Sequence, residues 1–335
     1  MKILSPVDKV EEAEKLIEAG AGELYCGILP SDWPYQTVSM NRRQEKNASF
    51  ETFEDLGACI KIAHSHGVPV FLTVNEHYCT AFEYPLLLDY IEKALELGVD
   101  AFIVTDLSLV LSLRERGAEV HISTGGTTFN SECARFYQSL GARRIILPRH
   151  LTVNEIWQIV KNAPEVKMEV FILNSKCPNI DGFCTFHHGL SELVPEEEKK
   201  HYRNACMLPY EISVEGHGEK VAWERQHIWQ ITHMDDRPCG ACALFDFMDM
   251  GVASAKIVGR GNSLFKKIVD IRFVKGCIDL LKGKTERQDF IKKARKLYQQ
   301  TYERPCRIYM CYYPDMEEHG VRNLHLQISR NWPDG

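Results

Sequence analysis

The residues of this 335-residue chain most suited to chemistry are cysteines in its second half. Cys177 and Cys184 are separated by six residues just after an apolar stretch, and Cys206 and Cys239 follow at longer spacing. Thiolates gathered in this way bind zinc or an iron–sulfur cluster, because both centres are soft and favour four sulfur donors. Cys242 adds a fifth cysteine between residues 177 and 242, out of twelve in the chain. We therefore predict a metal site, with disulfides or buried structural thiols as the alternatives.

The composition is that of an ordinary globular protein, with 44% hydrophobic and 26% charged residues. No apolar run reaches the length of a membrane span, and the first apolar strand begins directly after Met1 with no visible export signal. We therefore expect a cytoplasmic protein, in which thiols persist as metal ligands or core residues. The net charge is -6 and there is no basic tract, which argues against a broad nucleic-acid footprint and leaves a local basic pocket open.

Short apolar segments alternate with segments of helical period along most of the chain. The expected strands are residues 2–7, 23–28, 69–75, 101–106, 119–124, 144–148, 167–173 and 254–259. The expected helices are residues 10–19, 53–65, 84–97, 107–116, 131–140, 153–162, 245–250 and 262–281. Thr152 and Glu155 have the spacing of a capping box. Glycines that fit helix C-caps are Gly22, Gly67, Gly98, Gly117, Gly141 and Gly251.

Eight strand–helix units predict an α/β fold, a (β/α)8 TIM-barrel-like domain over residues 1–283. An open, doubly wound sheet is the alternative, because periodicity does not reveal closure. A polar insertion after the seventh strand, residues 174–236, carries metal ligands, and Cys239 follows shortly after it. Residues 284–335 are expected to form a short C-terminal extension with a helix, 287–302, and a strand-like tail that contains 308–313.

Barrel enzymes place their active sites at the carboxyl ends of the strands. The candidate catalytic residues there are Glu76, Asp106 and Arg149. The candidate substrate-binding residues are Tyr25, Asn75, Ser123, Thr124, Arg149, Lys256 and Arg260. Arginine holds carboxylates well, so a small-molecule carboxylate is the expected ligand. Alternatively, Asp106 and Ser123 only cap the following helices, and Lys256 is a solvated strand residue.

Several blocks of sequence resemble one known family. They are Glu169-x-Phe171-x2-Asn174-Ser175-Lys176-Cys177-x4-Gly182-x-Cys184, residues 22–27, 70–76, 101–106, 121–124, 136–149 and 251–260. In their order over about residues 1–265, these blocks are similar to the collagenase-like peptidase family U32. The family includes anaerobic ubiquinone-hydroxylation proteins and hydroxylases of transfer and ribosomal RNA. Those proteins work without dioxygen, take oxygen from prephenate and hold a [4Fe-4S] cluster on four cysteines.

The resemblance implies a [4Fe-4S] cluster on Cys177, Cys184, Cys206 and Cys239, with zinc as the alternative metal. Cys239 stands at the family's distance before the block 251–260, and Cys242 is the alternative fourth ligand. Other positions depart from the family pattern: Asn174 for a glycine, His187 for a serine, Val258 for a glutamate, His150 for an acid and Gly125 for a glutamine. The resemblance therefore predicts the cluster ligands better than the substrate.

Three functions remain open from the sequence. The first is an iron–sulfur enzyme that hydroxylates an organic acceptor without dioxygen, with Arg149 and Arg260 holding an acidic donor such as prephenate. The second is a peptidase, for which no Ser–His–Asp set or zinc-protease motif is identifiable, although Cys26 lies at the barrel mouth. The third is a non-catalytic, cluster-bearing subunit that supports a paralogous partner protein.

Overall fold

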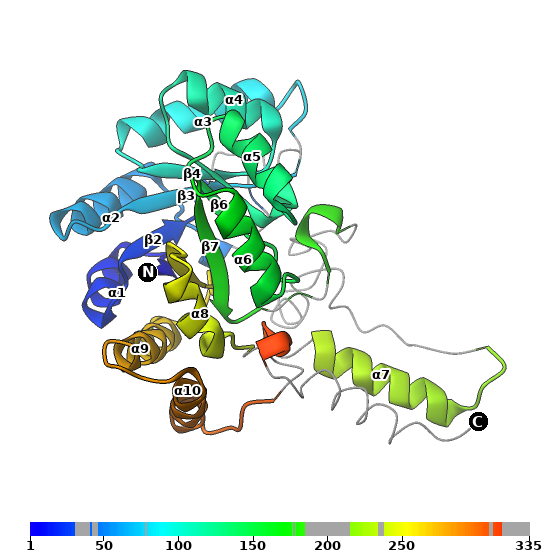
Figure 1. Cartoon of the computed structure of the whole chain (residues 1–335). Helices are drawn as coiled ribbons and strands as arrows, with labels where there is room; N and C mark the ends of the chain where they lie inside the picture. Colours follow the sequence, from blue (N-terminus) through cyan, green and yellow to red (C-terminus); the bar gives the residue numbers. More distant parts are fainter. Residues whose placement is uncertain are drawn as a thin grey trace.

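Eight parallel strands close into a barrel in the computed structural model, which describes residues 1–30, 41, 46–77, 79–175, 177, 179–184, 215–233, 238–307 and 311–316 (Figure 1). The strands are β1 (Lys2–Pro6), β2 (Glu23–Cys26), β3 (Val70–Val74), β4 (Ala101–Val104), β5 (Val120–Ile122), β6 (Arg144–Ile146), β7 (Lys167–Leu173) and β8 (Ser254–Ile257). Each strand pairs with the next, and β8 pairs with β1 through Lys2 and Ser254. This pairing confirms the predicted TIM-barrel-like fold and excludes the open sheet.

Helices surround the barrel (Figure 1). They are α1 (Ala13–Ala19), α2 (Phe53–Ser65), α3 (Tyr84–Glu96), α4 (Leu107–Glu115), α5 (Ser131–Ser139), α6 (Val153–Asn162), α8 (Leu244–Asp249), α9 (Leu264–Leu280) and α10 (Arg287–Tyr302). The capping box of Thr152 and Glu155 is confirmed at the start of α6. The helix α1 ends at Ala19 as expected, but the prediction of Gly22 as its C-cap was wrong: Gly20, with φ 120°, directly follows the helix and caps it.

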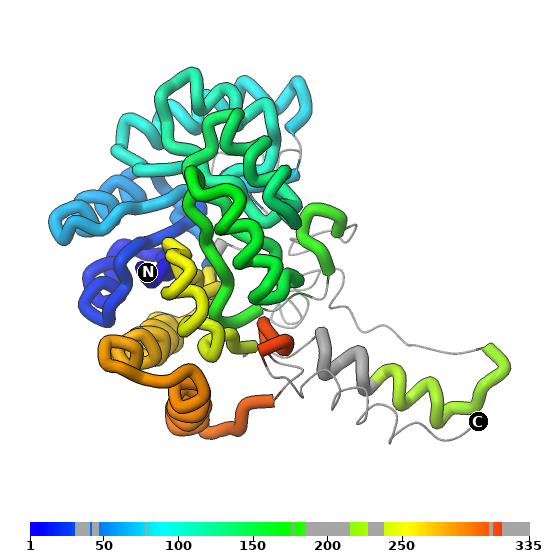
Figure 2. Tube along the Cα trace, in the orientation of Figure 1, coloured from blue at the N-terminus to red at the C-terminus, as the bar shows by residue number. Residues whose placement is uncertain are grey.

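The large insertion contains a helix that the sequence analysis did not predict, α7 (Glu219–His233). Its residues are mostly polar, so no apolar stripe marked it as a helix. Figures 1 and 2 show α7 lying apart from the ring of helices. None of the described helices combines the length and apolar character needed to cross a membrane.

The chain returns to the barrel near its C-terminal end (Figure 2). Residues 308–310 of the predicted strand-like tail lie outside the described part, and Cys311 forms a parallel β-bridge with Cys239. A short 3-10 helix, η9 (Pro314–Met316), follows. Tyr312 and Tyr313 between them are almost fully buried. Residues 311–316, which we call the return segment, therefore belong to the barrel's packed structure.

Candidate functional site at the barrel mouth

Two of the candidate metal ligands, Cys177 and Cys239, are close to the carboxyl end of β7 in sequence or in contact. Cys177 follows this strand by a few residues, and its thiol interacts electrostatically with that of Cys184. Cys239 forms an antiparallel bridge with Leu173, the last residue of the strand. Cys206 lies outside the described residues. Within the described part of the chain, no group of three or more His, Cys, Asp or Glu side chains is placed to hold a metal ion.

Cys242, the alternative ligand, has a different setting. Burial raises the pKa of its thiol, while the charge of Arg295 on α10 and a hydrogen bond from that guanidinium lower it. Burial also raises the pKa of Cys239, and a hydrogen bond from the Ala241 N–H to the Cys239 sulfur lowers it. Cys242 thus contacts the outer helix layer, whereas Cys239 is joined through its backbone to the end of β7.

A strained turn connects β7 to Cys177. Asn174 and Ser175 have φ of 66° and 49°, a left-handed conformation that costs most residues about 1–2 kcal/mol. The Asn174 side chain secures the turn: its Nδ2 donates to the Val258 carbonyl at 2.9 Å and to the Asp270 carboxylate at 2.7 Å. Lys266 Nζ donates to Asn174 Oδ1 at 2.9 Å. This turn is therefore fixed by tertiary contacts. It sets the start of the segment that carries Cys177 and Cys184, which we call the cysteine loop.

Arg149 is the charged centre of the mouth near this loop. Its Nη1 donates to the Asp181 carboxylate, and the guanidinium lies over the Phe171 ring, 4.1 Å from the centroid. Tyr312 of the return segment hydrogen-bonds to the same guanidinium. Burial lowers the pKa of Arg149, but the charges of Asp181, Tyr312 and Cys177 and the hydrogen bond with Tyr312 together outweigh it, so the pKa is raised overall. The Nε of Arg149 is buried and has no hydrogen-bond partner among the residues that the structure describes.

The loops after β3 and β5 meet the cysteine loop on its other side. The η4 turn (Asp181–Phe183) packs on the η3 turn (Thr124–Gly126). A Cβ on Gly182 would lie 2.4 Å from the Gly125 carbonyl oxygen, so this contact requires glycine. His77 Nε2 lies 2.7 Å from the Asp181 carbonyl oxygen and donates to it. The cysteine loop is thus attached to two other βα loops.

The polar residues predicted after β3 and β5 are also in contact. Asn75 Nδ2 donates to Ser123 Oγ at 3.2 Å. Glu76 Oε1 accepts from the His77 backbone N–H at 2.9 Å. Asp106 accepts from the Ser108 and Leu109 backbone N–H groups, so it caps α4.

Arg260 contacts the β2–β3 side of the mouth. Its Nη1 donates to Thr73 Oγ1 at 2.9 Å and to Asn41 Oδ1 at 3.2 Å. Thr73 in turn donates to the Cys26 carbonyl at 2.8 Å. Burial raises the pKa of the Cys26 thiol well above its usual value, more than Arg260 lowers it. Cys26 therefore lacks the lowered pKa and exposure of a nucleophilic thiol.

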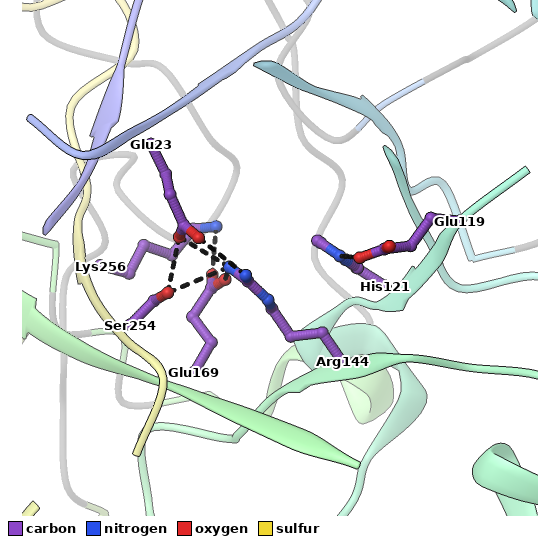
Figure 3. Close-up of polar contacts among 7 residues, drawn as sticks. All are labelled: Glu23, Glu119, His121, Arg144, Glu169, Ser254 and Lys256. Atoms are coloured by element: carbon purple, nitrogen blue, oxygen red, sulfur yellow. Dashed lines mark hydrogen bonds and ion pairs between the residues drawn. The ribbon is translucent and has the colours of Figure 1, made fainter. Parts of the chain in front are cut away.

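Four charged side chains are buried inside the barrel (Figure 3). Arg144 donates to both carboxylate oxygens of Glu23, at 2.7 and 2.8 Å, and to Glu169 at 3.3 Å. Lys256 Nζ donates to Glu169 at 2.8 Å. Ser254 donates to Glu23 and accepts from Arg144. The two positive and two negative charges balance, which compensates for the loss of hydration.

This network extends from the amino-terminal ends of the strands to the side chain of Tyr25 on β2. Glu23 and Arg144 begin β2 and β6, whereas Lys256 Nζ lies 4.1 Å from the centroid of the Tyr25 ring. Lys256, a candidate for substrate binding, is therefore buried and already paired with Glu169. Tyr25 donates to the Ile257 carbonyl.

Sequence reasoning missed three residues of the mouth: His77, Asp181 and Tyr312. His77 directly follows Glu76, and Asp181 lies inside the quoted cysteine signature, so both were close to residues already selected. Tyr312 is distant in sequence, and no local pattern places it beside Arg149.

Three known proteins are similar to large parts of this chain. A tRNA hydroxylation protein P of Helicobacter pylori is 28% identical over 216 residues, 64% of this chain and 48% of that protein. A collagenase of Porphyromonas gingivalis is 27% identical, covering 78% of this chain and 61% of that protein. A 23S rRNA 5-hydroxycytidine synthase of Escherichia coli is 27% identical, covering 78% of this chain and 36% of that protein. The chain thus spans less than two thirds of each of these relatives.

The family assignment has broader coverage than any of these pairwise matches. The model of peptidase family U32 matches residues 8–320, which include strands β2 to β8, the cysteine loop and the return segment. This chain belongs to peptidase family U32.

Proposed function

We propose that this protein is an iron–sulfur enzyme that hydroxylates an organic acceptor without dioxygen, using an acidic oxygen donor such as prephenate. The observation that carries the proposal is the contact between Arg149 and the loop that bears Cys177 and Cys184. A desolvated guanidinium is a strong carboxylate ligand, and here it lies beside the candidate cluster ligands.

The donor set fits an iron–sulfur cluster in chemical type. Cys177, Cys184 and Cys239 are free cysteines; the first two interact electrostatically, and Cys239 is bridged to Leu173 at the end of β7. With Cys206 they would hold the cluster, which supplies one-electron chemistry when bound. Arg149 would orient the carboxylate of the donor, and the Phe171 ring on its face would limit access of water.

RNA is the acceptor class to test first, because two of the relatives are named for tRNA and 23S rRNA. The reconstituted protein would be incubated without dioxygen with prephenate and with tRNA or rRNA fragments. Mass spectrometry of the nucleosides should show the gain of one oxygen atom, and Arg149→Ala should abolish it. No gain with any RNA would remove this acceptor class.

The peptidase alternative predicts a different result in the same preparation. Hydrolysis of gelatin or peptides that survives Cys177→Ala and Cys184→Ala would favour it over the hydroxylase. The environment of Cys26 argues against a thiol peptidase, because the Cys26 thiol is buried and its pKa is raised. A cluster-bearing subunit would load iron but show neither activity until a paralogous partner is added.

A further inference from the structure

Asp181 occupies the position on Arg149 that an acidic ligand would need. Its carboxylate accepts from Arg149 Nη1, and the two side chains are only 15% and 11% exposed. Phe171 covers a face of the guanidinium and Tyr312 bonds to it as well. The anion-binding edge of Arg149 is thus already engaged by a carboxylate of the chain itself.

The position of Asp181 is set by its backbone. The His77 ring donates to the Asp181 carbonyl at 2.7 Å, and neighbouring Gly182 packs directly on Gly125. The aspartate side chain has only two torsions, so little conformational entropy opposes its contact with Arg149. The contact between Asp181 and Arg149 therefore belongs to the ordered structure of the cysteine loop.

We propose that Asp181 is an internal counter-ion that an acidic ligand must displace, and that it is therefore a specificity-determining residue of the mouth. The inference rests on the proposed function, in which Arg149 binds the acidic donor. A ligand carboxylate and Asp181 compete for one guanidinium, so the apparent affinity equals the intrinsic affinity multiplied by the fraction of molecules in which Arg149 is accessible.

Displacement has a consequence for the metal loop. Asp181 lies between Cys177 and Cys184, so a ligand that releases it also releases a constraint on the segment between the two candidate cluster ligands. Because linkage is reciprocal, anything that fixes this segment changes the affinity of Arg149 for the acid.

Calorimetric titration with malonate and with prephenate tests the inference on four proteins: wild type, Asp181→Asn, the double variant Asp181→Asn/Arg149→Ala, and Glu132→Gln. Asp181→Asn keeps the size of the side chain and removes its charge, so it should bind both ligands at least about tenfold more tightly. Glu132→Gln removes an exposed acid that pairs with Arg135 on α5, and it should bind like the wild type. Adding Arg149→Ala to Asp181→Asn should cancel the gain.

Equal or weaker binding by Asp181→Asn, or no binding at all, overturns the inference. Iron content and the unfolding midpoint of each variant are measured in parallel. Asp181→Asn should keep the wild-type iron content and a single cooperative unfolding transition, with a lower midpoint because buried Arg149 loses its counter-ion. If cooperative unfolding is lost, Asp181→Ser supplies a second charge-removing variant under the same criterion. Failure of the hydroxylase proposal appears separately, as wild-type protein that holds no iron or transfers no oxygen.

Discussion

Two consecutive residues in an unfavourable conformation hold the start of the cysteine loop. Asn174 tolerates the left-handed region better than most residues, and its amide bonds to Val258 and Asp270. Ser175 adopts the same region, and no described hydrogen bond of its side chain offsets the cost. The tertiary contacts of Asn174 thus stabilise a backbone geometry that the local sequence alone disfavours.

Replacing each of these residues by glycine should have opposite effects. Ser175→Gly removes the steric cost of the left-handed conformation and should stabilise the protein by up to about 1 kcal/mol. Asn174→Gly also relieves the backbone but leaves buried Asp270 without the amide, so it should destabilise by about 1–3 kcal/mol. Urea unfolding of both variants measures this. Two changes of the same sign would contradict the account of the turn.

The sequence could predict the residues of the mouth that follow strands, but not their partners. Asn75 and Ser123 were predicted from their positions at the carboxyl ends of two expected strands, and they are hydrogen-bonded. Asp181 and Tyr312 could not be assigned to Arg149, because their contacts depend on how the insertion and the return segment fold back. Such long-range contacts leave no periodic signal in the chain.

At the scale of elements, the return segment joins parts of the mouth that are far apart in sequence. The Tyr312 backbone N–H donates to the Cys239 carbonyl at 3.0 Å, and its hydroxyl donates to the Asn174 carbonyl. The Tyr313 hydroxyl donates to the Phe171 carbonyl at 2.9 Å. Asp315 accepts from the Val153 N–H at the start of α6. The return segment therefore stabilises both the turn at Asn174 and Ser175 and the backbone at Cys239.

Tyr312 and Tyr313 form a matched pair for mutation. Each phenylalanine variant loses a buried hydroxyl and should destabilise the protein by about 1 kcal/mol. Only Tyr312→Phe removes a hydrogen bond to Arg149, so only this variant should change the affinity for malonate. Denaturant unfolding and calorimetric titration measure the two effects. A similar change of affinity in Tyr313→Phe would show that the effect is general loosening of the segment.

The sequence predicted all eight strands, but it missed helix α7 and the bridge between Cys311 and Cys239. The strong alternation of apolar and helical segments predicted the eight strands, and closure is confirmed by the pairing of β1 with β8. The helix α7 was missed because its apolar residues do not form one stripe. The contact between Cys311 and Cys239 was missed because a single bridge has no sequence pattern.

At the scale of the whole molecule, the barrel is unusual in holding a charged network where branched aliphatic side chains are common. Burial alone would raise the pKa of Glu169, but Lys256 and Arg144 outweigh it and lower that pKa below its usual value. Ionised Glu169 therefore stabilises the fold above its unfolded-state pKa, about 4.3. This contribution is lost as the pH falls through the lower pKa of the folded state.

Glu169→Gln tests this contribution. At pH 7 the variant leaves Lys256 and Arg144 without a charged partner and should lose about 3–5 kcal/mol of unfolding free energy. Its stability should then decline less than that of the wild type as the pH falls below about 4.3, because the titrating group is gone. Urea unfolding at a series of pH values measures both, with Glu132→Gln as the exposed control. Parallel pH profiles of wild type and Glu169→Gln would exclude the assigned pKa shift.

The central claim is that the cysteines around β7 hold an iron–sulfur cluster. Anaerobic reconstitution with iron and sulfide analysis should find about four irons per chain with broad charge-transfer absorption. Alanine at Cys177, Cys184, Cys206 or Cys239 should each abolish stable loading, whereas Cys242→Ala should retain it. Loss of iron only in Cys242→Ala would mean that the fourth ligand is misassigned. Full iron in all five variants, or zinc without iron in the wild type, would contradict the account.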